Sequence, residues 1–143
     1  MSVKFAVLGH GVVGSGVVEL FYKNKKSIEK RAGTEMDIKY ILDLRDFPDS
    51  PYHDKFTKNF DDIINDEEVV SVAECMGGVE PAFTFVMACL EKGKSVSTSN
   101  KELVAEKGDI LLKAAKEHNC NFFFEASVGG AIPIIRPLHK CLA

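Results

Sequence analysis

The hydrophobic positions of this chain change period repeatedly, from the close alternation of strands to the wider spacing of amphipathic helices. The strand pattern runs up to Gly9 and recurs at residues 37–43, 68–74, 95–98 and 121–125. Helical spacing lies between these runs, at residues 12–25, 59–65, from Pro81 to about 92, and from 99 to about 118. Strands and helices in this alternation predict an α/β fold, with a doubly wound, mainly parallel sheet and helices on both faces.

A glycine-rich turn, Gly9-His10-Gly11-Val12-Val13-Gly14, joins the first strand to the first helix. In a G-x-G-x-x-G turn the first glycine permits a tight bend, the second lets the backbone approach a pyrophosphate, and the third lets the helix pack close to the strand. The first N–H groups of the helix, at Val12 and Val13, then face the anion, which the helix dipole favours. The turn therefore predicts a dinucleotide site, although many families share the motif.

The second predicted strand ends on Asp43, where a dinucleotide fold places the acid that binds the adenosine ribose. Because that acid normally follows the glycine turn by about 20 residues, the longer connection here makes Asp43 a weaker match. Arg45 follows closely, and an arginine there pairs with the 2′-phosphate of NADP. Lys55 and Lys58 either add charge beside that phosphate or are ordinary solvated lysines. The choice between NAD and NADP stays open.

Two later strand ends carry further candidates. Met76, Gly77 and Gly78 follow one strand, where glycines would let the backbone approach the ribose or nicotinamide side of a cofactor. Lys101 begins the helix after the strand that ends at Thr98. A cation in the first turn opposes the helix dipole, so Lys101 either points into solvent or has a function at the carboxyl edge of the sheet.

A glycine-containing loop follows the last predicted strand, which ends at Glu125. Backbone carbonyls from such a loop, together with one carboxylate, suit a hard cation such as Na⁺ or Ca²⁺. Glu125 is also consistent with a surface acid or with a hydrogen-bond anchor for the loop. From the residues alone, the anchor is the first expectation.

Composition narrows the class of protein and of partner. With 143 residues, 45% of them hydrophobic, the chain is expected to form one soluble domain with an ordinary core. A formal net charge of −3 gives no electrostatic basis for nucleic acid or membrane binding, and no segment resembles a membrane span or a signal peptide. The cysteines are not spaced as metal ligands or as a redox pair, and the histidines are scattered. We therefore expect a cytoplasmic protein with reduced thiols, whose partner is a small molecule.

Four segments together resemble the N-terminal NAD(P)-binding domain of homoserine dehydrogenase. They are the Gly9–Gly14 turn, Met76-Gly77-Gly78-Val79-Glu80-Pro81, Val96-Ser97-Thr98-Ser99-Asn100-Lys101-Glu102-Leu103 and Glu125-Ala126-Ser127-Val128-Gly129-Gly130-Ala131-Ile132-Pro133. The resemblance runs through nearly the whole chain, and the last two segments are the most specific. It implies a Rossmann-type fold and, in the complete enzyme, hydride transfer between NAD(P) and the L-homoserine/L-aspartate 4-semialdehyde pair of threonine and methionine biosynthesis.

The resemblance also implies roles for individual residues. Lys101 corresponds to a catalytic lysine near the nicotinamide and the substrate oxygen, where it would relay a proton or polarise the aldehyde if a semi-buried site lowers its pKa. The candidate cofactor-binding residues are Gly9, Gly11, Val12, Val13, Gly14, Asp43, Arg45, Met76, Gly77, Gly78, Thr98 and Lys101. A structural monovalent-cation site, for Na⁺, would use Glu125 and the backbone of Val128, Gly130 and Ile132.

The same resemblance predicts the domain organisation. Residues 1–132 would form the NAD(P)-binding domain, and residues 133–143 would begin the connection to a substrate and dimerisation domain. That further domain would supply a second catalytic lysine and the acids for the homoserine amino group. The 143 residues alone are therefore expected to bind nucleotide without turning over homoserine, and the full-length protein is expected to be a homo-oligomer, a dimer.

Two alternatives remain open. One is another NAD(P) reductase of an amino-acid pathway, such as an aspartate dehydrogenase or a dihydrodipicolinate reductase. The other is a non-catalytic nucleotide-sensing domain, in which Asn100-Lys101 is incidental.

Overall fold

The structure, a computed structural model, describes residues 2–124. Its strands are β1 (Ser2–Leu8), β2 (Glu35–Leu42), β3 (Phe56–Thr57), β4 (Val69–Glu74), β5 (Ser95–Thr98) and β6 (Phe122–Phe124). Its helices are α1 (Val12–Lys23), α2 (Lys25–Ala32), α3 (Asp61–Ile64), α4 (Ala82–Glu91) and α5 (Lys101–Glu117), with a 3₁₀ turn at His53–Lys55. The predicted α/β architecture is confirmed.

All neighbouring strands are parallel, in the order β3-β2-β1-β4-β5-β6. The chain moves outward from β1 to β3 and then crosses back to β4 on the other side of β1. In a doubly wound sheet, this reversal leaves a crevice at the carboxyl ends of the two central strands, where ligands bind. The topology therefore places a site at the ends of β1 and β4.

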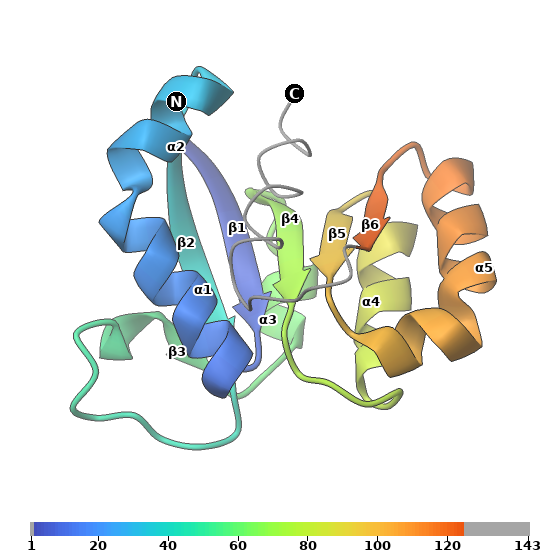
Figure 1. Cartoon of the computed structure of the whole chain (residues 1–143), viewed down its shortest axis with the longest axis horizontal. Coiled ribbons are helices and arrows are strands. Elements are labelled where there is room, and N and C mark those ends of the chain that lie inside the picture. The colour runs from blue at the N-terminus through green and yellow to red at the C-terminus, as the bar shows by residue number, and fades with distance from the viewer. Residues whose placement is uncertain (1, 125–143) are drawn as a thin grey trace.

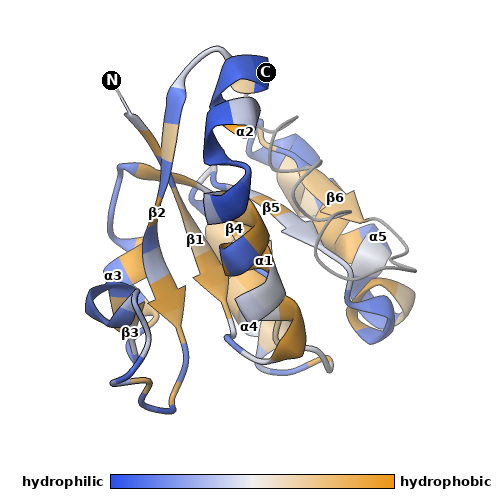
Figure 2. Ribbon diagram, turned by 60° about the vertical axis from the view of Figure 1, so that its left-hand side comes forward, coloured by the Kyte–Doolittle hydropathy of each residue, from blue (hydrophilic) through white to orange (hydrophobic). Residues whose placement is uncertain are grey.

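Two hydrophobic clusters cover opposite faces of the sheet. Successive residues of β1 alternate between them, because Phe5 and Val7 belong to one cluster while Ala6 and Leu8 belong to the other. Figure 1 shows α1 and α2 on one side of the sheet, and α4 and α5 on the other. In Figure 2 the carboxyl end of β1 is hydrophobic, whereas β2 alternates between hydrophilic and hydrophobic residues along its length.

The turn between β1 and α1 depends on two glycines. Gly9 has φ +95°, in the left-handed region that a side chain rarely adopts. A Cβ atom on Gly14 would lie 1.8 Å from the carbonyl oxygen of Gly9, well inside van der Waals contact. Only glycine at position 14 lets α1 pack this closely on the end of β1, so the role predicted for the third glycine is confirmed.

Two elements differ from the prediction. The basic stretch at the end of the predicted helix starts a second helix, α2, which runs to Ala32 and ends at Gly33 with φ +74°. Ile28 is its one buried residue, and Figure 2 shows most of α2 as hydrophilic, so hydrophobic periodicity could not reveal it. The two-residue strand β3 lies between the predicted strand at 37–43 and the predicted helix at 59–65, and it is too short to show alternation.

Candidate functional site

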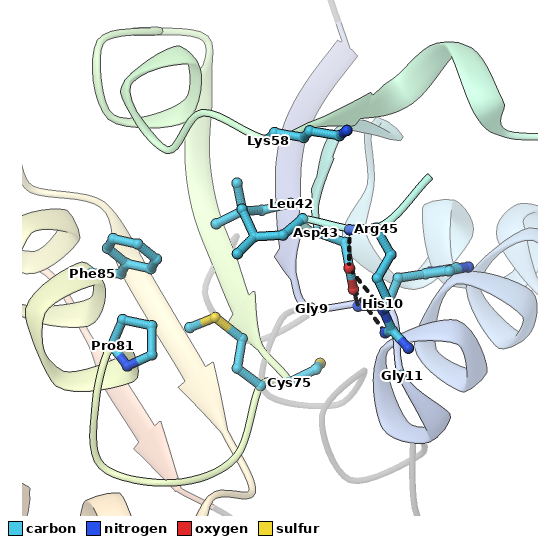
Figure 3. A pocket seen from close by; sticks show the side chains of 12 residues that line it. Gly9, His10, Gly11, Leu42, Asp43, Arg45, Lys58, Cys75, Pro81 and Phe85 are labelled. Atoms are coloured by element: carbon cyan, nitrogen blue, oxygen red, sulfur yellow. Dashed lines mark hydrogen bonds and ion pairs between the residues drawn. The ribbon is translucent and has the colours of Figure 1, made fainter. Parts of the chain in front are cut away.

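A cavity of about 380 Å³ opens at the carboxyl edge of the sheet, beside the ends of β1, β2 and β4. One wall carries the charged side chains Asp43, Arg45 and Lys58, and the opposite wall carries apolar groups (Figure 3). Its lining residues are Gly9, His10, Gly11, Leu42, Asp43, Leu44, Arg45, Lys58, Cys75, Met76, Pro81 and Phe85. The cavity thus joins the glycine turn to the end of β2, as the sequence predicted.

Asp43 is the most heavily hydrogen-bonded group in this cavity. Its carboxylate accepts the backbone N–H of His10 at 2.9 Å and that of Arg45 at 2.9 Å. The guanidinium of Arg45 donates to both carboxylate oxygens, from Nε and Nη2, each at 3.0 Å. The Arg45 guanidinium and the two N–H groups hold the pKa of Asp43 well below its usual range. Asp43 is therefore an ionised acid whose charge Arg45 already neutralises.

The two cations at the mouth of the cavity remain open to solvent. The Arg45 side chain is 64% exposed, although it pairs with Asp43 and lies over the ring of Phe47, with 5.3 Å between Cζ and the ring centroid. Lys58 makes an exposed ion pair with Asp46 at 2.9 Å, which contributes little stability. Both cations can thus meet an incoming anionic group without first leaving a buried position. Lys55 lies elsewhere and donates to the carbonyl of Ile38.

The ring of His10 packs edge-on against Phe47 and Phe56, with centroids 4.9 and 4.8 Å away. Its Nδ1 is buried without a hydrogen-bond partner among the described residues, and burial lowers the pKa of His10. His10 is thus a neutral ring that fixes the loop after β2 against the glycine turn.

The start of α1 faces the cavity without a side-chain cap. Gly11 is the N-cap residue and makes no side-chain hydrogen bond, and the first N–H groups of any helix lack intrahelical acceptors. A Cβ atom on Gly11 would lie 4.0 Å from Nη2 of Arg45, so the end of α1 is open on this side. Val12, which follows, is 92% exposed. This end of α1 can therefore receive a phosphate.

The other predicted cofactor residues lie further along the same edge, beyond the cavity lining. Gly77 and Gly78 have φ values of +79° and +72° and form an open loop after β4. The hydroxyl of Thr98, 1% exposed, is held by internal hydrogen bonds rather than presented to a ligand. Lys101 is the first residue of α5 and is exposed, so the described residues do not form the semi-buried environment expected for it.

The predicted cation site, Glu125 with Val128, Gly130 and Ile132, lies outside the described residues, as do Cys141 and the predicted connection at 133–143. Within residues 2–124, no group of His, Cys, Asp and Glu side chains could hold a metal ion.

Cys75, Cys89 and Cys120 are free thiols, and burial raises the pKa of Cys89 to about 12. No helix in the same part of the chain is long and apolar enough to cross a membrane.

Sequence reasoning missed the apolar wall of the cavity. Pro81 fits the start of the predicted helix, and Phe85 on that helix stacks on Phe60 with centroids 4.2 Å apart. The same ring also lines the cavity, together with Leu42 and Leu44. A partly buried aromatic residue on a helix has the same periodicity in either role, so the sequence carries no signal that separates them.

The family comparison agrees with this geometry. A family model described as "Homoserine dehydrogenase, NAD binding domain" matches residues 9–125. The chain is 36% identical to homoserine dehydrogenase of Lactococcus lactis, over 96% of this chain and 33% of that protein. It is 37% identical to the Bacillus subtilis enzyme, over 99% of this chain and 34% of that one. The chain thus spans about a third of the length of the curated relatives that it matches.

Solved structures give the same result. The homoserine dehydrogenase of S. aureus at pH 7.0 superimposes with a TM-score of 0.80 and 34% identity, covering 90% of this chain and 34% of that one. A hyperthermophilic archaeal homoserine dehydrogenase, solved in complex with NADPH, superimposes with a TM-score of 0.72, covering 96% of this chain and 48% of that one. Its identity of 24% supports the fold alone.

The hydrogen bonds of Asp43 lead to a pH-dependent prediction for stability. Because the folded-state pKa is lowered, the stabilisation is complete above the unfolded pKa of about 3.9 and is lost as the pH falls below it towards the folded value. We expect Asp43→Asn to lower the free energy of unfolding by about 1–2 kcal/mol at pH 7 and by less at pH 3. Denaturant titrations at both pH values measure the difference.

Asp46→Asn is the matched control, since its carboxylate is 79% exposed in the same loop. It is expected to leave unfolding unchanged at both pH values. A loss for Asp43→Asn that is the same at pH 7 and pH 3 would contradict the ionised, hydrogen-bonded state.

Proposed function

We propose that this chain holds the cofactor for hydride transfer between NAD(P) and the L-homoserine/L-aspartate 4-semialdehyde pair. The chain belongs to the homoserine dehydrogenase family and corresponds to its NAD-binding domain. The observation that carries the proposal is the cavity that joins the uncapped start of α1 to the Asp43–Arg45 pair.

The cofactor is proposed to lie along the carboxyl edge with its adenosine in the cavity. Its pyrophosphate meets the N–H groups of Val12 and Val13, where the helix dipole favours a negative charge. The adenine packs against the apolar wall formed by Leu44, Pro81 and Phe85. The nicotinamide then extends past Met76 towards the Gly77–Gly78 loop and the start of α5. Asp43 and Arg45 flank the adenosine ribose.

The pairing of Asp43 with Arg45 favours NADP over NAD. A ribose 2′-hydroxyl of NAD would need an acceptor on Asp43, whose two oxygens already accept four hydrogen bonds. A 2′-phosphate would instead meet the exposed guanidinium of Arg45, with Lys58 nearby. Because Arg45 also cancels the charge of Asp43, the carboxylate does not repel the phosphate.

Lys101 is proposed as the catalytic lysine, and the rest of its site is proposed to come from other parts of the complete enzyme. The described residues leave the lysine exposed, so a substrate domain that closes over the edge would supply the semi-buried environment. The homo-oligomeric full-length protein, its cytoplasmic location and the Na⁺ loop at Glu125, Val128, Gly130 and Ile132 belong to the same proposal.

Cofactor choice provides the first test. We expect Arg45→Ala to weaken NADPH binding by about tenfold or more, because a charge-assisted contact to the 2′-phosphate is lost, while NADH binding changes little. Fluorescence titrations of the chain with both reduced cofactors measure this split. Arg31→Ala, at the exposed end of α2, is the control and should affect neither. Equal losses for the two cofactors would exclude recognition of the 2′-phosphate by Arg45.

Catalysis provides the second test, in the full-length protein. Replacing Lys101 with Ala is expected to lower the turnover of homoserine by at least about 100-fold, with NADPH affinity mostly retained. Lys116→Ala, in the last turn of α5, is the control and should keep full activity. A wild-type protein that binds NADPH but turns over no homoserine would support the sensing alternative, and activity on a related amino-acid substrate alone would indicate another reductase.

A further inference from the structure

A closed series of hydrogen bonds lies at the end of β4, outside the cavity. The buried carboxylate of Glu74 accepts the N–H groups of Met76 at 2.8 Å and Gly77 at 3.2 Å through Oε2. Its Oε1 accepts the hydroxyl of Thr98 at 2.6 Å. The Thr98 hydroxyl oxygen in turn accepts the N–H of Asn100 at 2.9 Å. Asn100 Nδ2 closes the series by donating to the carbonyl of Gly78 at 2.6 Å.

This arrangement uses a glutamate where burial alone would favour an apolar residue. Glu74 is 0% exposed and Thr98 is 1% exposed, and a buried carboxylate is costly unless donors satisfy it. Each described hydrogen bond of the Glu74 carboxylate comes from a residue at the carboxyl edge. The carboxylate is therefore placed to order that edge, because a smaller apolar side chain would leave three donors without an acceptor.

The series fixes two segments that lie far apart in the sequence. One is the loop with Gly77 and Gly78, which both have positive φ values. Because glycine lacks a side chain, this loop has little intrinsic preference for a single conformation. The other is the start of α5, where Asn100 Oδ1 caps the helix by accepting the N–H of Leu103 at 3.2 Å. Lys101 follows Asn100 directly. The relative position of the loop and the lysine thus depends on Glu74 and Thr98.

Glu74 also affects where an anion can bind. Successive backbone N–H groups in a turn of this kind form a concave anion site, and Glu74 already occupies the one formed by Met76 and Gly77. The cofactor phosphates are consequently left to the start of α1. The loop after β4 remains available for the uncharged part of the cofactor.

From this we propose that Glu74 is a positioning residue, which together with Thr98 and Asn100 holds the Gly77–Gly78 loop and the start of α5 in the conformation that receives the nicotinamide half of the cofactor. The inference rests on the proposed function only in placing the nicotinamide at this end of the edge.

Two ligands of different reach test the proposal: NADPH, and 2′,5′-ADP, which is only its adenosine half. For Glu74→Gln we expect NADPH binding about tenfold weaker, because the amide cannot replace both carboxylate oxygens as acceptors, and 2′,5′-ADP binding unchanged. Thr98→Val, which keeps the side-chain shape but removes the hydroxyl, should give the same split. Thr98→Ser should restore NADPH binding. Glu80→Gln is the control, because Glu80 is exposed and bonds only to Thr84 among the described residues.

The binding of the two ligands separates a positioning role of Glu74 from a general structural role. Unchanged NADPH binding in both Glu74→Gln and Thr98→Val would overturn it, and so would equal losses of the two ligands, which would indicate a general structural role. If Glu74→Gln fails to fold by circular dichroism, Thr98→Val and its serine rescue decide the question. A wild-type chain that binds neither ligand would reject the proposed function itself, whereas a wild-type chain that binds both leaves only the positioning role at issue.

Discussion

The close contact between Gly14 and the carbonyl oxygen of Gly9 is the constraint on which the site depends. It sets the start of α1 directly over the end of β1, at a distance that no Cβ atom allows. The uncapped N–H groups of α1 therefore point into the crevice between the halves of the sheet. It also places the N–H of His10 within 2.9 Å of Asp43 at the end of β2, so one backbone contact brings the proposed phosphate and ribose positions together.

The carboxyl edge uses two buried or partly buried acids in different ways. Asp43 is paired with an exposed cation, and the pair remains in contact with solvent and with an entering ligand. Glu74 has no cation among its described partners and is satisfied by backbone and hydroxyl donors. The first arrangement suits recognition of a charged group, and the second suits the fixing of a loop. In the proposed orientation of the cofactor, charge selectivity thus belongs to the adenosine end, and backbone order to the other end.

The sequence predicted the fold, and which segments meet at the carboxyl edge, because both follow from local rules. Glycines at fixed spacing, a strand that ends on Asp43 and a helix that starts near Lys101 all leave a periodic or positional signal. The family resemblance, which the comparisons confirm, came from longer motifs at the strand ends. Element boundaries agreed within a few residues for the strongly amphipathic segments.

What the sequence could not predict depends on contacts between distant residues. The hydrophilic α2 and the two-residue β3 have too few buried positions to produce a pattern. The packing of His10 between two aromatic rings, the double role of Phe85 and the internal use of Thr98 arise only when separate segments meet. The exposure of Lys101 is likewise a property of the folded surface, since sequence shows that a lysine is present but not what encloses it.

The proposed cofactor site requires that a dinucleotide binds along this edge with its phosphates on the start of α1. The most direct measurement is a titration of the ¹⁵N-labelled chain with NADPH, followed by ¹H–¹⁵N NMR. We expect saturable shifts that are largest at the amides of Gly11, Val12 and Val13, with further large shifts at Arg45 and Gly77. Shifts concentrated on the opposite edge of the sheet, or the absence of any saturable shift, would contradict it.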